Sequence, residues 1–406
     1  MAVARAADAG VAEPAGGSLM ERVSSPRSAD ATTRYPRAVE RVGVVIVGGG
    51  PMGVAAARAL GSRGREVLLF ERSALGHDGG SSAGPTRNFR LTYHDPIYVR
   101  MARLALEGFR RLEDEAGVEL LRTVGGLDVG VPTDVSAAAL EAAGEPYERP
   151  SDDEVADRFP TLRFPPGSRF LYQSDGGILR SKEVIRALAD RAVAAGAAIR
   201  EETTVASIRL AGAGVEVRTD RDEVVRAPAA ILAAGAWTGP LARSVGLELP
   251  LRPTLEQSTY LDLDSGGLPT VIDWSASADE PPYLVPNPFD GGDAKAGAHL
   301  SGRDVDPDTR SFDPDVAIEA RVLGWVRDRV VGPVELRRTE TCLYTRTPDE
   351  DFVIDRIGPV VVASPCSGHG FKFTPVIGEV LADLVTGSEP AVPLDRFAVR
   401  RPALVP

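Results

Sequence analysis

The stretch that decides the fold is Val42-Gly43-Val44-Val45-Ile46-Val47-Gly48-Gly49-Gly50-Pro51-Met52-Gly53. Its Val-rich beginning is typical of a central strand in a parallel sheet that is covered on both faces. The glycines that follow fit the pattern G-x-G-x-x-G, and a helix-forming stretch at 56–60 comes next. A second apolar run, 66–71, ends in Glu71. This order of strand, glycine turn, helix and strand predicts a βαβ unit.

Each residue of this pattern has a mechanical reason. Gly48 permits the tight turn, Gly50 lets a pyrophosphate approach the backbone, and Gly53 lets the helix pack against the strand. The helix N-terminus offers free N–H groups to an anion. Glu71 follows Gly48 by 23 residues and is placed to accept hydrogen bonds from ribose hydroxyls. The unit therefore predicts a bound dinucleotide, and the acid at position 71 disfavours a 2′-phosphate, which leaves NAD or FAD.

The rest of the chain alternates in the same way and then changes character. We expect a helix at 182–195, strands at 198–208, 215–217 and 229–234, and a closing strand and helix at 360–363 and 376–384. Between about 246 and 325 the sequence has short, Pro- and Asp-rich extended pieces, which suggest a mainly antiparallel second domain. Residues 1–40 have no apolar period, so we expect a disordered leader.

Composition narrows the classes of partner. A formal net charge of -12 argues against nucleic acid or an anionic membrane surface, since both need a basic face. No window approaches the roughly 18 uninterrupted apolar residues of a membrane span. Two cysteines, Cys342 and Cys366, are too few for a disulfide framework and fit a reducing compartment. We expect a cytoplasmic protein with a small-molecule partner.

Lysine is rare in this chain, because only Lys182, Lys295 and Lys372 stand among 46 basic residues. Arginine carries a planar, permanently charged fork, whereas lysine is a compact ammonium that can lose its proton, so the two differ most in active sites. Lys295 precedes His299 by four residues and Lys372 ends the run Ser367-Gly368-His369-Gly370-Phe371-Lys372. Lys182 stands at an expected helix start and needs no functional explanation.

Two further segments favour FAD over NAD. Residues 229–237 are apolar and end in Ala233-Ala234-Gly235-Ala236-Trp237, as in the returning strand with which flavoproteins cover their cofactor, although an ordinary strand and turn read the same way. Val205 is a candidate adenine contact and equally a candidate core residue. Met52, Arg72 and Ser82 complete the cofactor contacts that we expect from these segments.

Five motifs then occur in an order that resembles monomeric sarcosine oxidase and N-methyltryptophan oxidase, FAD-dependent amine oxidases of the D-amino-acid-oxidase superfamily. They are Gly80–Arg90, Lys295–His299 before Asp306–Thr309, Thr341–Thr345, Asp349–Asp355 and Ser367–Phe373. The resemblance covers about residues 43–400. It implies an α/β fold with a Rossmann-like, glutathione-reductase-like FAD-binding domain and an inserted α+β substrate domain. We place the FAD-binding domain at 41–95, 165–245 and 326–400, and the substrate domain at 96–164 and 246–325.

The resemblance also implies roles. Cys342 matches the residue that carries the flavin covalently, and Arg87 matches one that assists the attachment. Lys295 matches the lysine that activates dioxygen, where a localised positive charge stabilises superoxide. Arg90 and Lys372 match the pair that holds the substrate carboxylate.

The remaining matches concern the walls of the site. His299 and Tyr283 match residues of the active-site wall, and backbone N–H groups near Gly368 and Gly370 are expected to face the flavin pyrimidine. His369 is as well explained by packing, and Cys366 by a small buried hydrophobe. Where sarcosine oxidases have two consecutive histidines, this chain has Ser82 and Ala83. That departure leaves the substrate's identity open and suggests a roomier site.

We therefore expect an FAD-dependent oxidase of a secondary or cyclic α-amino acid, such as an N-methyl amino acid or a pipecolate-like imino acid. It would yield an imine and reduce O2 to H2O2, and we expect it to act as a monomer. Two alternatives stay open: a flavin dehydrogenase that passes electrons to a carrier, and a non-catalytic dinucleotide-binding protein.

Overall fold

The first sheet of the fold is six-stranded and contains the Val-rich run as an inner strand. The computed structural model describes residues 39–289 and 293–404, so residues 1–38 of the disordered leader expected at 1–40 lie outside the described residues. All neighbours in this sheet pair in parallel except the β20–β21 hairpin at one edge. Its order is β20 (Val353–Ile357), β21 (Val360–Ser364), β13 (Ala229–Leu232), β2 (Val44–Val47), β3 (Val67–Phe70) and β9 (Ala198–Arg200).

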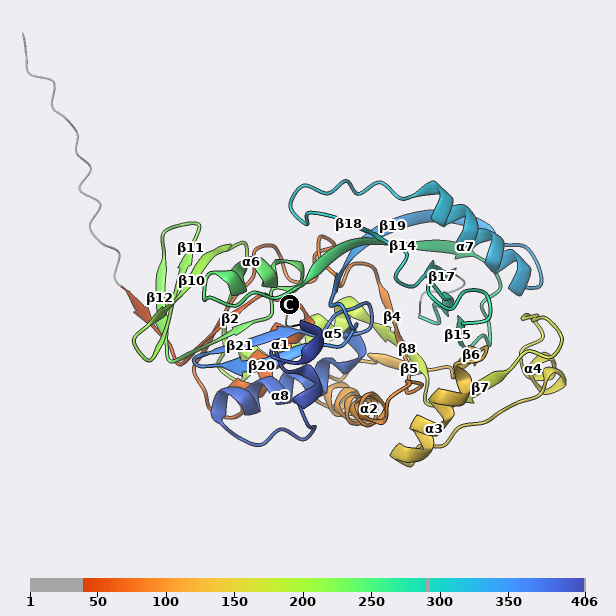
Figure 1. Cartoon of the computed structure of the whole chain (residues 1–406), viewed down its shortest axis with the longest axis horizontal. Helices are drawn as coiled ribbons and strands as arrows, with labels where there is room; N and C mark the ends of the chain where they lie inside the picture. Colours follow the sequence, from red (N-terminus) through yellow and green to blue (C-terminus); the bar gives the residue numbers. More distant parts are fainter. Residues whose placement is uncertain (1–38, 290–292, 405–406) are drawn as a thin grey trace, which may run out of the picture. The chain divides into compact units, whose positions relative to one another are not determined.

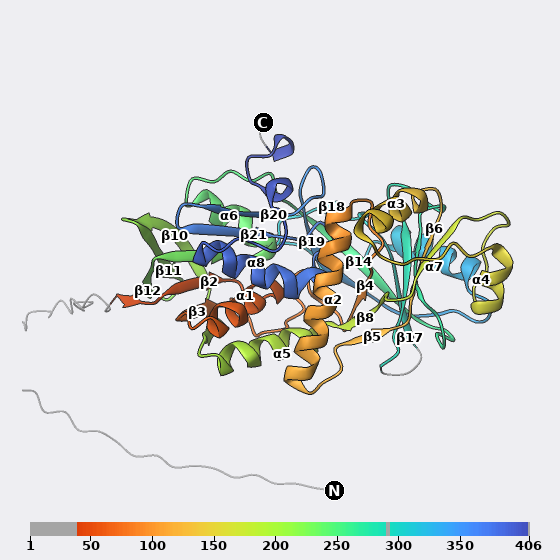
Figure 2. The same cartoon turned by 90° about the horizontal axis from the view of Figure 1, so that it is seen from below.

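Both faces of this sheet are covered, as the unbroken apolar run predicts. On β2, Val44 and Ile46 belong to a core shared with helices, while Val45 and Val47 belong to a second core shared with a four-stranded sheet. The helices packed together on the first face are α1 (Pro51–Ser62), α2 (Pro96–Ala116), α5 (Ser181–Ala194) and α8 (Thr374–Thr386), as Figure 2 shows. The four-stranded sheet has the order β1 (Glu40–Arg41), β12 (Val224–Ala227), β11 (Gly214–Thr219) and β10 (Val205–Ala211).

A second large sheet has eight strands, seven of them in one path and β19 beside it, and is mainly antiparallel, with β15–β6 its parallel pair. Its order is β18 (Arg303–Asp304), β14 (Arg252–Asp262), β17 (Asp293–Ala298), β16 (Pro282–Pro286), β15 (Thr270–Asp273), β6 (Gly126–Val129) and β7 (Phe170–Gln173), and β19 (Glu335–Arg346) also pairs with β14. Helix α7 (Val316–Arg329) packs on it around Trp325. Figure 1 shows β14 and β19 running side by side as its longest strands.

The smaller elements connect these layers. A three-stranded sheet has the order β4 (Thr86–Phe89), β8 (Gly177–Arg180) and β5 (Leu121–Thr123). The remaining α-helices are α3 (Thr133–Ala143), α4 (Asp152–Arg158) and α6 (Thr238–Arg243). Short 3-10 helices occupy Gly235–Trp237, Phe371–Phe373, Asp395–Phe397 and Pro402–Leu404.

The predicted βαβ unit and the mainly antiparallel second sheet are confirmed. The expectation of only short extended pieces between 246 and 325 is wrong, because this region holds the 11-residue strand β14 and most of helix α7. The split into two domains stays a prediction.

Candidate active site

The glycine-rich turn lies at the carboxyl end of β2, where α/β sheets bind their ligands. Gly48 has a φ of 108°, and a Cβ at Gly53 would stand 1.9 Å from the carbonyl oxygen of Gly48. Both positions therefore require glycine. Each oxygen of the buried Glu71 carboxylate accepts one backbone N–H, from Gly49 at 2.7 Å and from Ser73 at 2.8 Å. A carboxylate offers about four acceptor positions, so Glu71 keeps about two for the hydroxyl groups of a ribose. The backbone N–H groups of the turn fit the pyrophosphate of the same dinucleotide.

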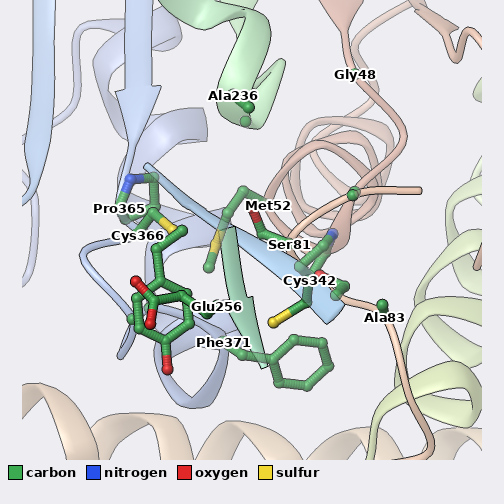
Figure 3. Close-up of a pocket in the computed structure, with 18 of the residues that line it drawn as sticks. Gly48, Met52, Ser81, Ala83, Ala236, Glu256, Cys342, Pro365, Cys366 and Phe371 are labelled. Atoms are coloured by element: carbon green, nitrogen blue, oxygen red, sulfur yellow. The ribbon is translucent and has the colours of Figure 1, made fainter. Parts of the chain in front are cut away.

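A cavity of about 540 Å³ extends from this turn into the second sheet. It is lined by all the predicted site residues except Gly53, which lies behind Gly48. The lining includes Met52, Arg72, Ser82 and Val205 at the dinucleotide end, and Tyr283, Lys295, His299 and Cys342 from the second sheet. Figure 3 draws Gly48, Met52, Ala83 and Cys342 around it. The structure thus brings together residues that lie up to 324 positions apart, from Gly48 to Lys372.

Two lysines in this cavity are almost fully buried, with 6% of each exposed. Lys295 Nζ donates to the Thr86 carbonyl at 2.7 Å, and Lys372 Nζ donates to the His369 carbonyl at 2.9 Å. Burial and the nearby Arg87 charge lower the pKa of Lys295 to about 7. Burial, with the charge of Arg90, also holds the pKa of Lys372 well below its usual value.

Two arginines join them at the same cavity. Arg87 donates to the carbonyls of Ser81, Ala83 and Thr86, while Arg90 donates to the Thr92 carbonyl and lies 4.5 Å over the Tyr93 ring. Within residues 39–289 and 293–404 no ion pair is formed by any of four cations: Arg87, Arg90, Lys295 or Lys372. Cations gathered in a buried space without a carboxylate partner favour the binding of an anion.

Aromatic side chains close the site near these cations. The His299 ring lies 5.7 Å from that of Tyr344, and the Tyr283 hydroxyl lies 3.3 Å from Ser258 Oγ. Burial lowers the pKa of His299 to about 3, so the ring is neutral. The loop with Gly368 and Gly370 follows β21 and also lines the cavity. His369 stacks on Phe352 at 4.7 Å, as expected of a packed ring.

Cys342 lies on β19 and its side chain faces the cavity (Figure 3). Burial raises the pKa of its thiol to about 11, while the charges of Arg87 and Lys295 act in the opposite direction. Cys366 is half-buried rather than fully buried, accepts a hydrogen bond from the Thr345 backbone N–H at 3.2 Å, and also lines the cavity. Cys366 was expected to be a small buried hydrophobe; it is instead half-buried and lines the cavity.

The lining also includes residues without a predicted role, among them Glu256, Trp274 and Tyr344. Glu256 is paired with Cys342 across β14 and β19, so only knowledge of the strand pairing would have found it. Tyr344 stands two residues after Cys342 in a strand, and this spacing places both side chains on one face. Among the described residues, no group of His, Cys, Asp and Glu could hold a metal ion, and no helix is long and apolar enough to cross a membrane.

Similarity to known proteins agrees with this site. The chain is 31% identical over 377 residues to monomeric sarcosine oxidase of Bacillus sp. (strain B-0618), covering 89% of this chain and 96% of the relative. It is 26% identical to N-methyl-L-tryptophan oxidase of Yersinia pestis, covering 88% and 98% of the two chains. NikD, an amino acid oxidase essential for nikkomycin biosynthesis, superimposes with a TM-score of 0.79 at 28% identity, over 89% of this chain and 98% of NikD.

The family model that matches the chain spans residues 43–384, from the strand before the glycine turn to the last helix. The sequence motifs, the dinucleotide cradle and the relatives agree, and they set the non-catalytic alternative aside. The chain belongs to the FAD-dependent oxidoreductase (DAO) family, among relatives of the sarcosine oxidase group.

Proposed function

We propose that this protein oxidises the C–N bond of a secondary or cyclic α-amino acid and reduces dioxygen to hydrogen peroxide. The observation that carries the proposal is the group of unpaired cations in one buried cavity, because an amino acid substrate brings the missing anion as its carboxylate. The relatives named sarcosine oxidase and N-methyl-L-tryptophan oxidase support the same substrate class.

Arg90 and Lys372 hold the substrate carboxylate in this proposal. Arg90 supplies a planar fork with two parallel N–H groups, and Lys372 supplies a point charge. The neutral His299 ring and the Tyr283 hydroxyl form walls beside them. FAD held at the glycine turn and Glu71 would supply a two-electron acceptor for the hydride equivalent of the substrate Cα–H bond; the amine, which also loses a proton, would become an imine, and dioxygen would receive the two electrons and two protons as hydrogen peroxide.

Lys295 provides the positive charge for the oxygen reaction. Superoxide is the first product of one-electron reduction of dioxygen, and a buried ammonium stabilises an anion more strongly than an exposed one does. The ammonium is 6% exposed and its pKa lies at about 7, so it is charged in the lower part of the neutral range.

We also propose that Cys342 forms a thioether with the flavin. The thiol must lose its proton first: burial raises its pKa, and the neighbouring Arg87 and Lys295 charges act in the opposite direction, toward the thiolate. Acid precipitation of the purified protein should leave yellow flavin in the pellet, with a matching gain in intact mass. Cys342→Ser should release the flavin into the supernatant, and flavin that stays attached to this variant would place the tether elsewhere. Cys366→Ser is the matched control and should keep the flavin.

Peroxide release with N-methyl and cyclic amino acids tests the proposed reaction directly. Lys295→Met should lower the rate of oxygen consumption by ten-fold or more, as loss of one electrostatic contact to a developing anion does. A variant that reacts with oxygen as fast as wild type, while an artificial electron acceptor supports turnover, would favour the dehydrogenase instead.

The proposal also includes domain bounds, an oligomeric state, a cellular location and the kinds of partner that we do not expect. The FAD-binding domain comprises 41–95, 165–245 and 326–400, and the substrate domain comprises 96–164 and 246–325. The protein acts as a monomer in the cytoplasm, without nucleic acid or membrane as partner. The name of the relative monomeric sarcosine oxidase supports the expected monomeric state.

A further inference from the structure

Glu256 is a buried carboxyl group in the wall of the active-site cavity that the proposed reaction does not use. It lies on β14, is 3% exposed, and lines the same cavity as Lys372 and Cys342. Figure 3 draws it among the lining side chains together with Cys342, Cys366 and Phe371. A buried carboxyl group is costly, so its presence calls for a partner.

The protein supplies only some of the hydrogen-bond donors that the Glu256 carboxylate can accept. Thr254 Oγ1 donates to Glu256 Oε1 at 2.7 Å, and the Gly302 backbone N–H donates to Oε2 at 3.0 Å. Within residues 39–289 and 293–404, Glu256 forms no ion pair, in contrast to Glu340, which lines the cavity and pairs with Arg338. A carboxylate has about four acceptor positions, so about two remain for a ligand.

The strand register directs Glu256 toward the reaction site. Glu256 is the direct cross-strand partner of Cys342, and directly paired side chains share a face of the sheet with Cβ atoms about 4.5–5.5 Å apart. The next pair on this face is Thr254 with Tyr344. Glu256 therefore shares one face of the sheet with Cys342, which lies directly opposite, and with Tyr344, which lies diagonally across the two strands.

Glu256 and the carboxylate-binding cations influence the pKa values of two neighbouring rings, Tyr344 and His299. Tyr344 and His299 lie 5.7 Å apart. The Glu256 charge contributes to the raised pKa of Tyr344, after burial and Tyr283, and the charges of Arg90 and Lys372 contribute to the lowered pKa of His299, after burial. This ring pair thus lies within electrostatic range of both the cations and the Glu256 carboxyl group.

We propose that Glu256 determines specificity by accepting a hydrogen bond from an N–H or O–H group on the side chain of the substrate. This rests on the proposed function and narrows it: the preferred substrate is an amino acid that carries a donor, best a cationic one, beyond its α-carboxylate and its reacting amine. Ser82 and Ala83 line the same cavity with small side chains.

The test compares substrates that differ only in that donor. One pair is Nα-methyl-L-lysine and Nα-methyl-L-norleucine, and the other is N-methyl-L-serine and N-methyl-L-alanine. Wild type should favour the donor-bearing member of at least one pair by about 10-fold or more in kcat/KM, the size expected for a hydrogen bond to a charged group. Glu256→Gln should reduce that preference several-fold, and Glu340→Gln, the matched control, should leave it unchanged.

A second measurement distinguishes a contact with the substrate side chain from a general disturbance of carboxylate binding. Binding of thiophene-2-carboxylate, which has no N–H or O–H donor at pH 8, is followed by the change in flavin absorbance. Its Kd should be the same in wild type and Glu256→Gln, because the donor-free carboxylate does not reach Glu256. If the Gln variant does not fold, Glu256→Asp, which keeps the charge but shortens the side chain, should show the same loss of preference.

Four results would overturn the inference. Equal kcat/KM within both substrate pairs in wild type would remove it while leaving the proposed function intact, whereas absence of oxidation of every substrate would remove both. Loss of covalent flavin in Glu256→Gln would assign the carboxyl group to the Cys342 thiol instead of to the substrate. An equal fall in kcat/KM for all substrates would assign it to the structure of the site.

Discussion

At the scale of single residues, the buried ammonium groups are the most unusual feature. Lys295 is almost fully buried and has one hydrogen-bond acceptor, the Thr86 carbonyl. Its pKa in the folded protein, about 7, lies below the ordinary value of 10.5. The folded protein therefore releases this proton at a pH at which the unfolded chain still keeps it.

Burying the charged form of Lys295 costs free energy of folding, and the pH dependence of stability should reveal this cost. Between about pH 7 and 10.5 the unfolded state binds more protons at this position, so the free energy of unfolding of wild type rises with pH. Lys295→Met removes the cost, so this variant should be more stable than wild type by up to about 4 kcal/mol at pH 6, with the difference vanishing toward pH 10.5. Urea unfolding across this range measures it. Lys182→Met, at an exposed lysine, should show no such trend, and a pH-independent difference in Lys295→Met would contradict the assignment.

Lys372 gives a prediction about binding. Lys372→Met should raise KM for the carboxylate substrate by tens to hundreds of times, because a charge-assisted contact of about 2 to 3 kcal/mol is lost. Steady-state kinetics with the best substrate measure it. Lys372→Arg restores the charge and should recover part of the loss. A KM unchanged in Lys372→Met would move the carboxylate to another part of the cavity.

Residues differ in how far the sequence alone predicts them. Lys295 and Lys372 could be singled out because lysine is scarce and both stand in short motifs with histidine. Glu256 could not, because its importance comes from its register opposite Cys342, 86 residues away. Long-range strand pairing leaves no local signal in one sequence, whereas a motif does.

At the scale of elements, the turn between β2 and α1 depends on close backbone contact. A Cβ at Gly53 would meet the Gly48 carbonyl oxygen at 1.9 Å, and backbone atoms cannot move aside as the end of a flexible side chain can. The turn and the helix must therefore separate to admit even one methyl group.

Gly53→Ala should weaken FAD retention and destabilise the protein by about 1–3 kcal/mol, the usual cost of overpacking. The measurements are the flavin-to-protein absorbance ratio and thermal unfolding. Gly324→Ala is the control, because Gly324 also lies in a helix but has open space around its Cβ position. Alanine there should be neutral or stabilising by up to about 1 kcal/mol. A Gly53→Ala protein with full flavin content would show that the turn tolerates the shift.

Elements with a strong local pattern were predictable, and those held by distant contacts were not. The unit of β2, α1 and β3 follows from an apolar run, glycines and a second apolar run within residues 42–71. Helices α2 and α7 were not predicted. In α7 only Val322, Trp325 and Val326 are buried, so its apolar stripe is short and is defined by the sheet that it covers.

At the scale of the whole molecule, one cavity draws its lining from both large sheets. The glycine turn and Glu71 belong to the first sheet, while Lys295 and Cys342 belong to strands of the second. A cofactor that fills this cavity contacts both sheets at once and binds the folded state alone.

Occupancy of the cavity should therefore stabilise both sheets together. In Cys342→Ser, from which we expect flavin to be removable, excess FAD should raise Tm by several degrees while a single unfolding transition is kept. Calorimetry of the flavin-free and reloaded variant measures this, with NAD as the matched control ligand that should have no effect. Two separate transitions, of which FAD shifts only one, would contradict the shared site.

The placement of the lysines has a practical consequence for chemical labelling. Lys295 and Lys372 are each 6% exposed, whereas the side chain of Lys182 is 42% exposed and pairs with Asp78 at 2.8 Å. An amine-reactive dye or resin applied to the native protein thus finds one accessible lysine side chain besides the α-amino group. Together with the α-amino group, Lys182 offers a site for immobilising or labelling the protein with the two buried ammonium groups untouched.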